Sequence, residues 1–326
     1  MNMKYRTTLL SAAILLSGLA VLSCTKTEGD SFSTPPVNKA AAVAFTDDGA
    51  TNGLFAIGEG TYVRFSRGNL QYQASSRTWR FANNQYDFIG SANENISATN
   101  AGWIDLFGWG TSGWNSGATC YQPYENNADP ALYAPQGNPS VDLAGTQADW
   151  GVNNAISNGG NRAGSWRTLT REEWNYLFGN SDGEAYGRTE LWGAATVGTA
   201  PGIVLLPNRR CGADGVAYRW QLPEGLTFVA GQSAGWTTNT YTLEQWTLLE
   251  LSGAVFLPAA QYRDNYSAGG GAFASTYIDI TDGYYWTTTR VNSTSAYIVR
   301  LSANKKITLM DRQYGLSVRL VSDYRN

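Results

Sequence analysis

The feature that most constrains the fold is an alternation of apolar and polar residues near the carboxyl end. Three segments alternate with a period of two and are joined by only a few residues, at 296–301, 306–310 and 316–321. This period is typical of β-strands with one face toward a core, and short connections favour antiparallel neighbours. The sequence therefore predicts a β-meander, in whose last strand Ser317 and Arg319 face away from the apolar residues.

Other parts of the chain carry local signals of their own. Further strands are expected at 61–66, 70–72, 79–81, 254–257 and 284–289, with a turn at 74–77. A helix is expected from Thr170 to Gly179, because a threonine cap, a glutamate at the third helical position and a terminal glycine mark its ends. A weaker helical pattern covers 146–156. Segment 102–138 lacks periodicity but is rich in glycine and aromatic residues, which predicts an ordered loop that shields them from water.

Residues 1–23 have the organisation of a secretory signal. Lys4 and Arg6 precede an apolar run of about 14 residues, which is shorter than the ~20 residues of a membrane-spanning helix. The run ends in Val21-Leu22-Ser23-Cys24, which resembles the lipobox of bacterial lipoproteins. Cys24 is therefore the predicted site of acylation by fatty acids such as palmitate. The alternative is an ordinary signal peptide followed by an unrelated cysteine.

The residues after this cysteine indicate where the protein is held. Thr25 stands where an aspartate typically retains such lipoproteins in the inner membrane, so an outer-membrane lipoprotein anchored by lipid alone is expected. Glu28 and Asp30 resemble the acidic cluster of surface-exported lipoproteins, which favours display on the cell surface. Segment 24–40 is polar and nearly free of hydrophobes, so we expect a flexible tether followed by one domain at 41–326.

Composition limits the chemistry available to this domain. The chain has 36 Gly, 12 Trp, 19 Tyr and 11 Phe, with 15% charged residues and no histidine. Aromatic and glycine richness with few charges suits a loop-rich extracellular β fold. Without histidine there is no imidazole base, no Ser-His-Asp triad and no histidine-bearing zinc or iron site. We therefore predict no catalytic residue, no metal site and no cofactor.

Two cysteines remain besides Cys24. Cys120 and Cys211 are candidates for a disulfide, because an exported protein meets an oxidising compartment. The alternative is that the two thiols are buried separately, since cysteine is among the most buried residue types. The sequence leaves both interpretations open.

Several motifs resemble one known group of folds. Segment 166–174, WRTLTREEW, is similar to a motif of the formylglycine-generating, sulfatase-modifying enzymes, whose fold is a large variant of the C-type lectin fold. Segments that resemble major-paralogous-domain (FISUMP-like) lipoproteins of gut bacteria, and the carboxyl-terminal part of retroelement-diversified variable proteins, are 256–263, 283–289, 296–297 and 315–321. The resemblance implies an α+β, C-type lectin-like fold with twisted antiparallel sheets, about two helices and long ordered loops.

The resemblance does not extend to the chemistry of the enzymes. Those that generate formylglycine use a cysteine pair near the carboxyl end, and this chain has no cysteine after Cys211. Sugar-binding lectins that use calcium carry Glu-Pro-Asn or Gln-Pro-Asp and Trp-Asn-Asp motifs. Here Gln122-Pro123-Tyr124 lacks the final ligand, and no Trp-Asn-Asp occurs. Neither activity is expected.

Ligand binding is expected on the carboxyl-terminal meander. In the diversified relatives the variable residues lie on this face, and the corresponding positions are Arg290, Asn292, Ser293, Thr294, Ser295, Tyr297, Asp311, Arg312, Gln313 and Tyr314. Tyrosine and arginine supply contact area, while serine, threonine and asparagine adapt their hydrogen bonds. Residues 284–326 hold seven basic and two acidic residues, which favours an acidic partner. A pI near 5.1 argues against nucleic acid.

The leading hypothesis is therefore a non-catalytic, surface-displayed lipoprotein that binds a protein ligand through this face, with diversification by a retroelement as a further expectation. The alternative is a carbohydrate-binding or carbohydrate-processing outer-membrane lipoprotein, in which Trp109 and Trp114 stack on sugars. Against this, both tryptophans could belong to the core. A purely structural envelope protein without a ligand is a third hypothesis.

Overall fold

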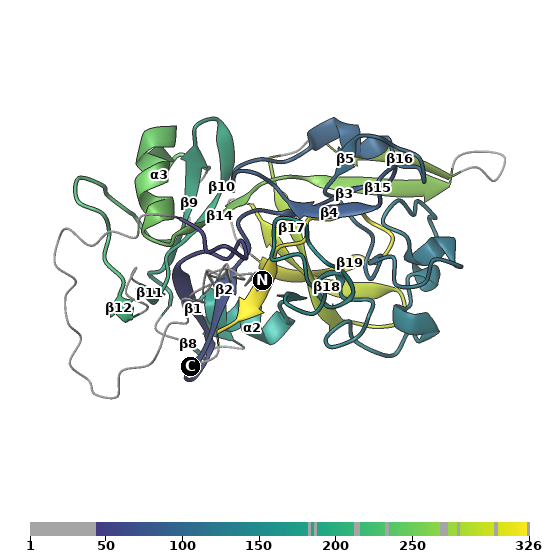
Figure 1. Cartoon of the computed structure of the whole chain (residues 1–326), viewed down its shortest axis with the longest axis horizontal. Helices are drawn as coiled ribbons and strands as arrows, with labels where there is room; N and C mark the ends of the chain where they lie inside the picture. Colours follow the sequence, from purple (N-terminus) through teal and green to yellow (C-terminus); the bar gives the residue numbers. More distant parts are fainter. Residues whose placement is uncertain are drawn as a thin grey trace, which may run out of the picture.

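Antiparallel strands make up most of the regular structure of the protein (Figure 1). The computed structural model describes residues 44–181, 184–185, 188–211, 216–231, 235–267, 273–278, 281–302 and 306–324. The predicted signal at 1–23, the acylation site Cys24 and the predicted tether at 24–40 lie outside the described residues. No described helix is long and apolar enough to span a membrane.

Two sheets form the larger part of the framework. The six-stranded sheet has the order β12-β11-β1-β2-β20-β6, formed by Ala217–Arg219, Arg209–Cys211, Gly53–Gly58, Thr61–Phe65, Leu320–Asp323 and Arg167–Thr168. The four-stranded sheet has the order β13-β9-β10-β14, formed by Asn239–Tyr241, Trp192–Val197, Ala200–Leu205 and Val255–Pro258. β13 pairs with β9 in parallel, and the other strand pairs are antiparallel.

Four smaller sheets complete the strands. The meander β17-β18-β19 is formed by Gly283–Arg290, Ser295–Leu301 and Lys306–Asp311. A second three-stranded sheet, β4-β3-β5, is formed by Thr78–Phe81, Leu70–Gln73 and Trp103–Ile104. Two hairpins are β15-β16, at Tyr262–Ser267 and Phe273–Ile278, and β7-β8, at Asn180–Ser181 and Glu184–Ala185.

Three α-helices are present among the described residues, at Trp150–Asn153 (α1), Arg171–Leu177 (α2) and Leu243–Leu251 (α3). α2 confirms the prediction in detail, because Thr170 and Glu173 form the capping box and Gly179 has a φ of +77°. α1 is shorter than the predicted helix, since it begins after the Asp149 cap and Asn154 is already extended. Short 3-10 turns lie at Gly90–Glu94, Thr119–Tyr121, Pro130–Leu132 and Pro135–Gly137.

Sequence reasoning missed α3, although its signals were present. Thr242 and Gln245 form a capping box, and Gly253 has a φ of +98° just after the helix end. This is the same start and stop pattern that identified α2. Figure 1 shows α3 beside β9, β10 and β14, at the end of the molecule opposite the β15-β16 hairpin.

The carboxyl-terminal meander consists of different strands from those predicted. β17, β18 and β19 are neighbours, but the segment after Tyr314 leaves their sheet. Gly315 pairs with Arg263, Ser317 pairs with Tyr285, and β20 then joins β2 and β6. The prediction of 316–321 as the third meander strand is therefore wrong. Every side chain from 316 to 320 is at most 1% exposed, so this segment needs neighbours on both faces.

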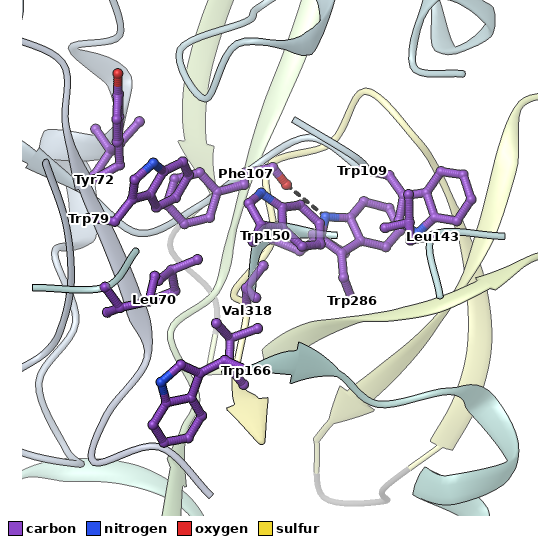
Figure 2. Packing of buried hydrophobic residues seen from close by; sticks show 14 of the residues in the cluster. Leu70, Tyr72, Trp79, Phe107, Trp109, Leu143, Trp150, Trp166, Trp286 and Val318 are labelled. Atoms are coloured by element: carbon purple, nitrogen blue, oxygen red, sulfur yellow. Dashed lines mark hydrogen bonds between the residues drawn. The ribbon is translucent and has the colours of Figure 1, made fainter. Parts of the chain in front are cut away.

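The largest core cluster joins the meander, strands β3 and β4, segment 143–166 and the long loop at 102–138 (Figure 2). Trp286 of β17 donates from its indole nitrogen to the carbonyl of Phe107 at 2.7 Å, and the indole of Trp109 donates to the carbonyl of Thr287 at 2.9 Å. Phe107 and Trp109 are fully buried. The loop is therefore ordered, as predicted, because its aromatic residues fill the core.

Candidate functional site

The predicted site begins at the turn that joins β17 to β18, residues 291–294. Asn292 and Ser293 are exposed, whereas Val291 and Thr294 are half-buried. The side-chain oxygen of Asn292 accepts from the backbone N–H groups of Thr294 at 2.8 Å and Ser295 at 2.9 Å. These bonds fix the turn without help from the side chain of Ser293. The turn therefore offers an ordered, exposed polar surface.

Arg290 flanks this turn and remains partly accessible. Its Nε lies 3.9 Å from Oδ1 of Asp142, and its backbone N–H donates to the same oxygen at 2.9 Å. The side chain is 39% exposed, so the ion pair is weak in water. Arg290 can therefore turn toward a ligand at little cost.

Three of the ten predicted contacts are buried, and for them the prediction is wrong. Ser295 is 5% exposed and donates from its hydroxyl to Asp311 at 2.7 Å. Gln313 is 8% exposed, and its backbone carbonyl accepts from Asn265 at 2.7 Å. Arg312 is completely buried. These side chains stabilise the base of the meander and do not form a surface.

Arg312 connects three loop segments to one another. Its guanidinium lies 4.2 Å from the ring centroid of Trp109 and donates to the carbonyls of Tyr133, Pro139 and Asn292. Burial lowers the pKa of its guanidinium to about 10, so the group stays charged at neutral pH. Arg312 thus holds the exposed turn against the loop at 102–138.

Tyr297 lies on the other face of the meander. Side chains alternate along β18, so Tyr297 points to the same face as Val299 and to the opposite face from Ala296 and Ile298. The two faces contribute to different core clusters. The guanidinium of Arg171, in α2, lies 4.6 Å from the centre of the Tyr297 ring. The predicted residues therefore do not form one continuous patch.

Asp311 and Tyr314 are half-buried, and Tyr314 joins a group of rings that we call the tyrosine cluster, Tyr262, Tyr284 and Tyr314. The ring of Tyr262 contacts Tyr284 at 5.1 Å and Tyr314 at 5.7 Å between centroids, in both cases edge to face. Sequence reasoning did not include Tyr262 or Tyr284 in the site. Three separate segments supply these rings, and no spacing in the sequence indicates that they meet.

Among the described basic residues of 284–326, all but Lys306 are buried or paired with a carboxylate. Arg312 and Arg319 are buried, and Arg300 donates twice to Oδ2 of Asp282, at 2.8 and 2.6 Å. Arg290 faces Asp142. The expectation of an acidic partner drawn from this excess is therefore not supported by the described residues.

The tryptophans proposed to stack on sugars have different environments. Trp109 is fully buried beneath Arg312, so it cannot contact a sugar. Trp114 is half-buried and packs on Tyr121 with 4.8 Å between ring centroids. Only Trp114 remains available to that alternative.

The disulfide between Cys120 and Cys211, which the sequence left open, is not formed, because Cys120 carries a free thiol. The two residues lie in different environments. Cys120 lies in the loop at 102–138, where burial raises the pKa of its thiol. Cys211 ends β11 and packs beside Leu54.

Two carboxyl groups have the raised pKa values that often mark catalytic acids, but both serve the fold. Burial raises the pKa of Asp105 and of Asp149 to about 6. Neither is accessible: Asp105 accepts from Asn93 and from the backbone of Ile89, and Asp149 accepts from the backbone and hydroxyl of Thr168. No group of three or more acidic or cysteine side chains that could hold a metal occurs within the described ranges.

Comparison with known proteins identifies no matching family model, no matching curated protein and no matching solved structure.

Proposed function

We propose that this chain is a non-catalytic lipoprotein of the C-type lectin-like fold. It is acylated at Cys24, displayed on the outer membrane, and binds a protein ligand through the turn at 291–294. The exposed turn supports this proposal, because its backbone is fixed by Asn292 and Arg312 while Ser293 and Arg290 remain accessible. A fixed surface loses little conformational entropy on binding.

Display on the outer membrane predicts a specific behaviour of intact cells. Protease added outside should remove the chain from wild-type cells, and the Cys24→Ser variant should leave the membrane fraction, because lipid would be its only anchor. Immunoblots of shaved cells and of membrane fractions measure both effects. If the protease left both the chain and periplasmic marker proteins intact, outward display would be contradicted. Retention of the serine variant in the membrane would contradict acylation at this position.

Binding through the turn predicts that one bulky substitution blocks the ligand. Ser293→Trp should abolish binding to arrayed cell-surface proteins, because the side chain of Ser293 is exposed and makes no hydrogen bond within the described structure. Ser75→Trp is the matched control, since Ser75 is exposed in the distant turn at 74–77. Arrayed glycans and the Trp114→Ala variant test the alternative. A ligand that survives Ser293→Trp but is lost on Trp114→Ala would contradict the proposed surface.

A further inference from the structure

The outward face of β15 carries a second candidate site, separate from the turn at 291–294. Along this strand Arg263 and Asn265 are buried, whereas Tyr262 and Asp264 are half-exposed and Tyr266 is 44% exposed. Because successive side chains of a strand point to opposite faces, Tyr262, Asp264 and Tyr266 share the outward face. Two aromatic rings and a carboxylate therefore stand in one row at the surface.

The tyrosine cluster extends this row sideways. Tyr314 contacts Tyr262 edge to face because the backbone of Gly315 pairs with Arg263, which brings the two segments together. Within the described structure the hydroxyls of Tyr262 and Tyr314 form no hydrogen bond, and both side chains are half-exposed. The rings are held in place while their hydroxyls remain available.

Asp264 is the unsatisfied group of this surface. Among the described residues it has neither a basic partner nor a hydrogen-bond donor, although burial raises the pKa of its carboxyl. Asp264 lies two residues after Tyr262 on the same face of β15, and the ring of Tyr262 contacts that of Tyr314, so the carboxylate and the two rings belong to one surface. Burial raises the pKa of both tyrosine hydroxyls, and the charge of Asp264 adds to this effect. The carboxylate of Asp264 is partly accessible to water, so a ligand cation can pair with it without displacing a partner within the described structure.

The neighbouring charges do not compensate Asp264. The guanidinium of Arg300 lies 5.8 Å from the centre of the Tyr284 ring, but its charge is paired with Asp282 at 2.6 Å. Arg263 is buried behind the strand, where it donates to Asn265, Ser275 and the carbonyl of Leu106. Asp311, whose backbone carbonyl accepts from the N–H of Tyr314 at 3.3 Å, adds a second negative charge. The surface is therefore electronegative and aromatic, a combination that attracts cations and repels anions.

We propose that Tyr262, Tyr314 and Asp264 form a binding subsite for an organic cation, namely the ammonium group of a lysine side chain on a partner protein. The alkyl stem would lie along the two rings, and the ammonium would pair with the carboxylate of Asp264. The faces of the rings and the carboxylate act on the same positive charge, so both contributions are lost when that charge is absent. The subsite does not depend on the turn at 291–294, so either proposal can fail alone.

The test uses the purified full chain and two small probes of matched shape. Nα-acetyl-lysine amide carries the side-chain ammonium group, and Nα-acetyl-norleucine amide has the same alkyl stem without it. In an NMR titration at constant ionic strength we expect the lysine probe to bind with a Kd of about 1 mM, and the norleucine probe at least about tenfold more weakly. Equal binding of the two probes, or no binding of either, would overturn the proposal.

Variants locate the site on the protein. Asp264→Asn keeps the shape of the side chain but removes its negative charge. It should weaken binding of the lysine probe at least about fivefold. Tyr314→Leu should weaken it similarly, whereas Tyr314→Phe keeps the ring and should change it less than about twofold. Glu59→Gln is the matched control, because Glu59 is exposed in the turn before β2 and its loss changes the net charge equally. Unchanged binding in Asp264→Asn, or an equal loss in Glu59→Gln, refutes the subsite.

Discussion

Replacing Arg312 by alanine is expected to lower the free energy of unfolding by roughly 3–5 kcal/mol, which is a large part of the stability of a typical domain. The substitution removes the donor to the buried carbonyl of Tyr133 and to the part-buried carbonyls of Pro139 and Asn292. It also removes the cation from the ring of Trp109. Loss of the desolvated charge offsets part of this cost. We also expect the turn at 291–294 to lose part of its order, because the guanidinium of Arg312 joins the carbonyl of Asn292 to those of Tyr133 and Pro139.

Urea unfolding measures the first effect, and binding of the array ligand measures the second. Arg312→Lys should recover only part of the stability, since a compact ammonium cannot spread donors over three carbonyls and stack on an indole. Arg290→Ala is the control, because this exposed arginine should change stability by less than about 0.5 kcal/mol while still affecting binding. If Arg312→Ala removed binding and left stability unchanged, Arg312 would be a ligand contact after all.

Local signals in the sequence predicted local structure well. The ends of α2 follow from the caps at Thr170 and Gly179, which act through neighbouring backbone groups only. Most predicted strands lie within one or two residues of the observed bounds, because alternation is a property of the strand itself. The last predicted strand failed for the opposite reason. Residues 315–317 pair with single residues of β15, the loop at 102–138 and β17, and no local pattern reveals these partners.

The candidate site was only partly predictable for the same reason. Composition indicated a polar turn, and Ser293 is indeed exposed there. Composition cannot show that the loop at 102–138 covers Arg312, or that Tyr262 from β15 meets Tyr314 from another segment. The sequence alone does not show whether an arginine near a tyrosine is exposed at a surface or buried in a core.

Buried arginines explain in part why the basic excess of 284–326 misled the prediction of the partner. Four arginines of the described structure are fully buried, and two of them, Arg312 and Arg319, belong to that excess. The four, which are among the largest fully buried side chains, are Arg188, Arg263, Arg312 and Arg319. In the described structure none of them pairs with a carboxylate, and each donates to backbone carbonyls or side-chain amides instead. Arginine suits this task because its fork of five donors can satisfy several loop carbonyls at once. The charge of these four arginines therefore stabilises loops in the interior and does not contribute to a ligand-binding surface.

Trp286→Ala is expected to destabilise the protein by about 3–5 kcal/mol, because the indole is 1% exposed and lies between the meander and the loop at 102–138 (Figure 2). Most of this cost should come from lost packing and little from the lost hydrogen bond. The carbonyl of Phe107 that accepts from Trp286 also accepts from the backbone N–H of Leu316 at 3.0 Å, so it keeps one donor.

Trp286→Phe separates the two contributions. It keeps an aromatic ring but removes the indole donor, so we expect a loss of only about 1–2 kcal/mol in urea unfolding. Trp103→Ala is the matched control for the alanine variant, because Trp103 is half-exposed. It loses mainly the contact between its ring centre and the guanidinium of Arg80, 3.7 Å apart, so its free energy of unfolding should fall by only about 1 kcal/mol. If the phenylalanine variant were as unstable as the alanine variant, the hydrogen bond from Trp286 would dominate. The loop would then be held by directed polar bonds, as at Arg312, more than by the packing of its aromatic rings.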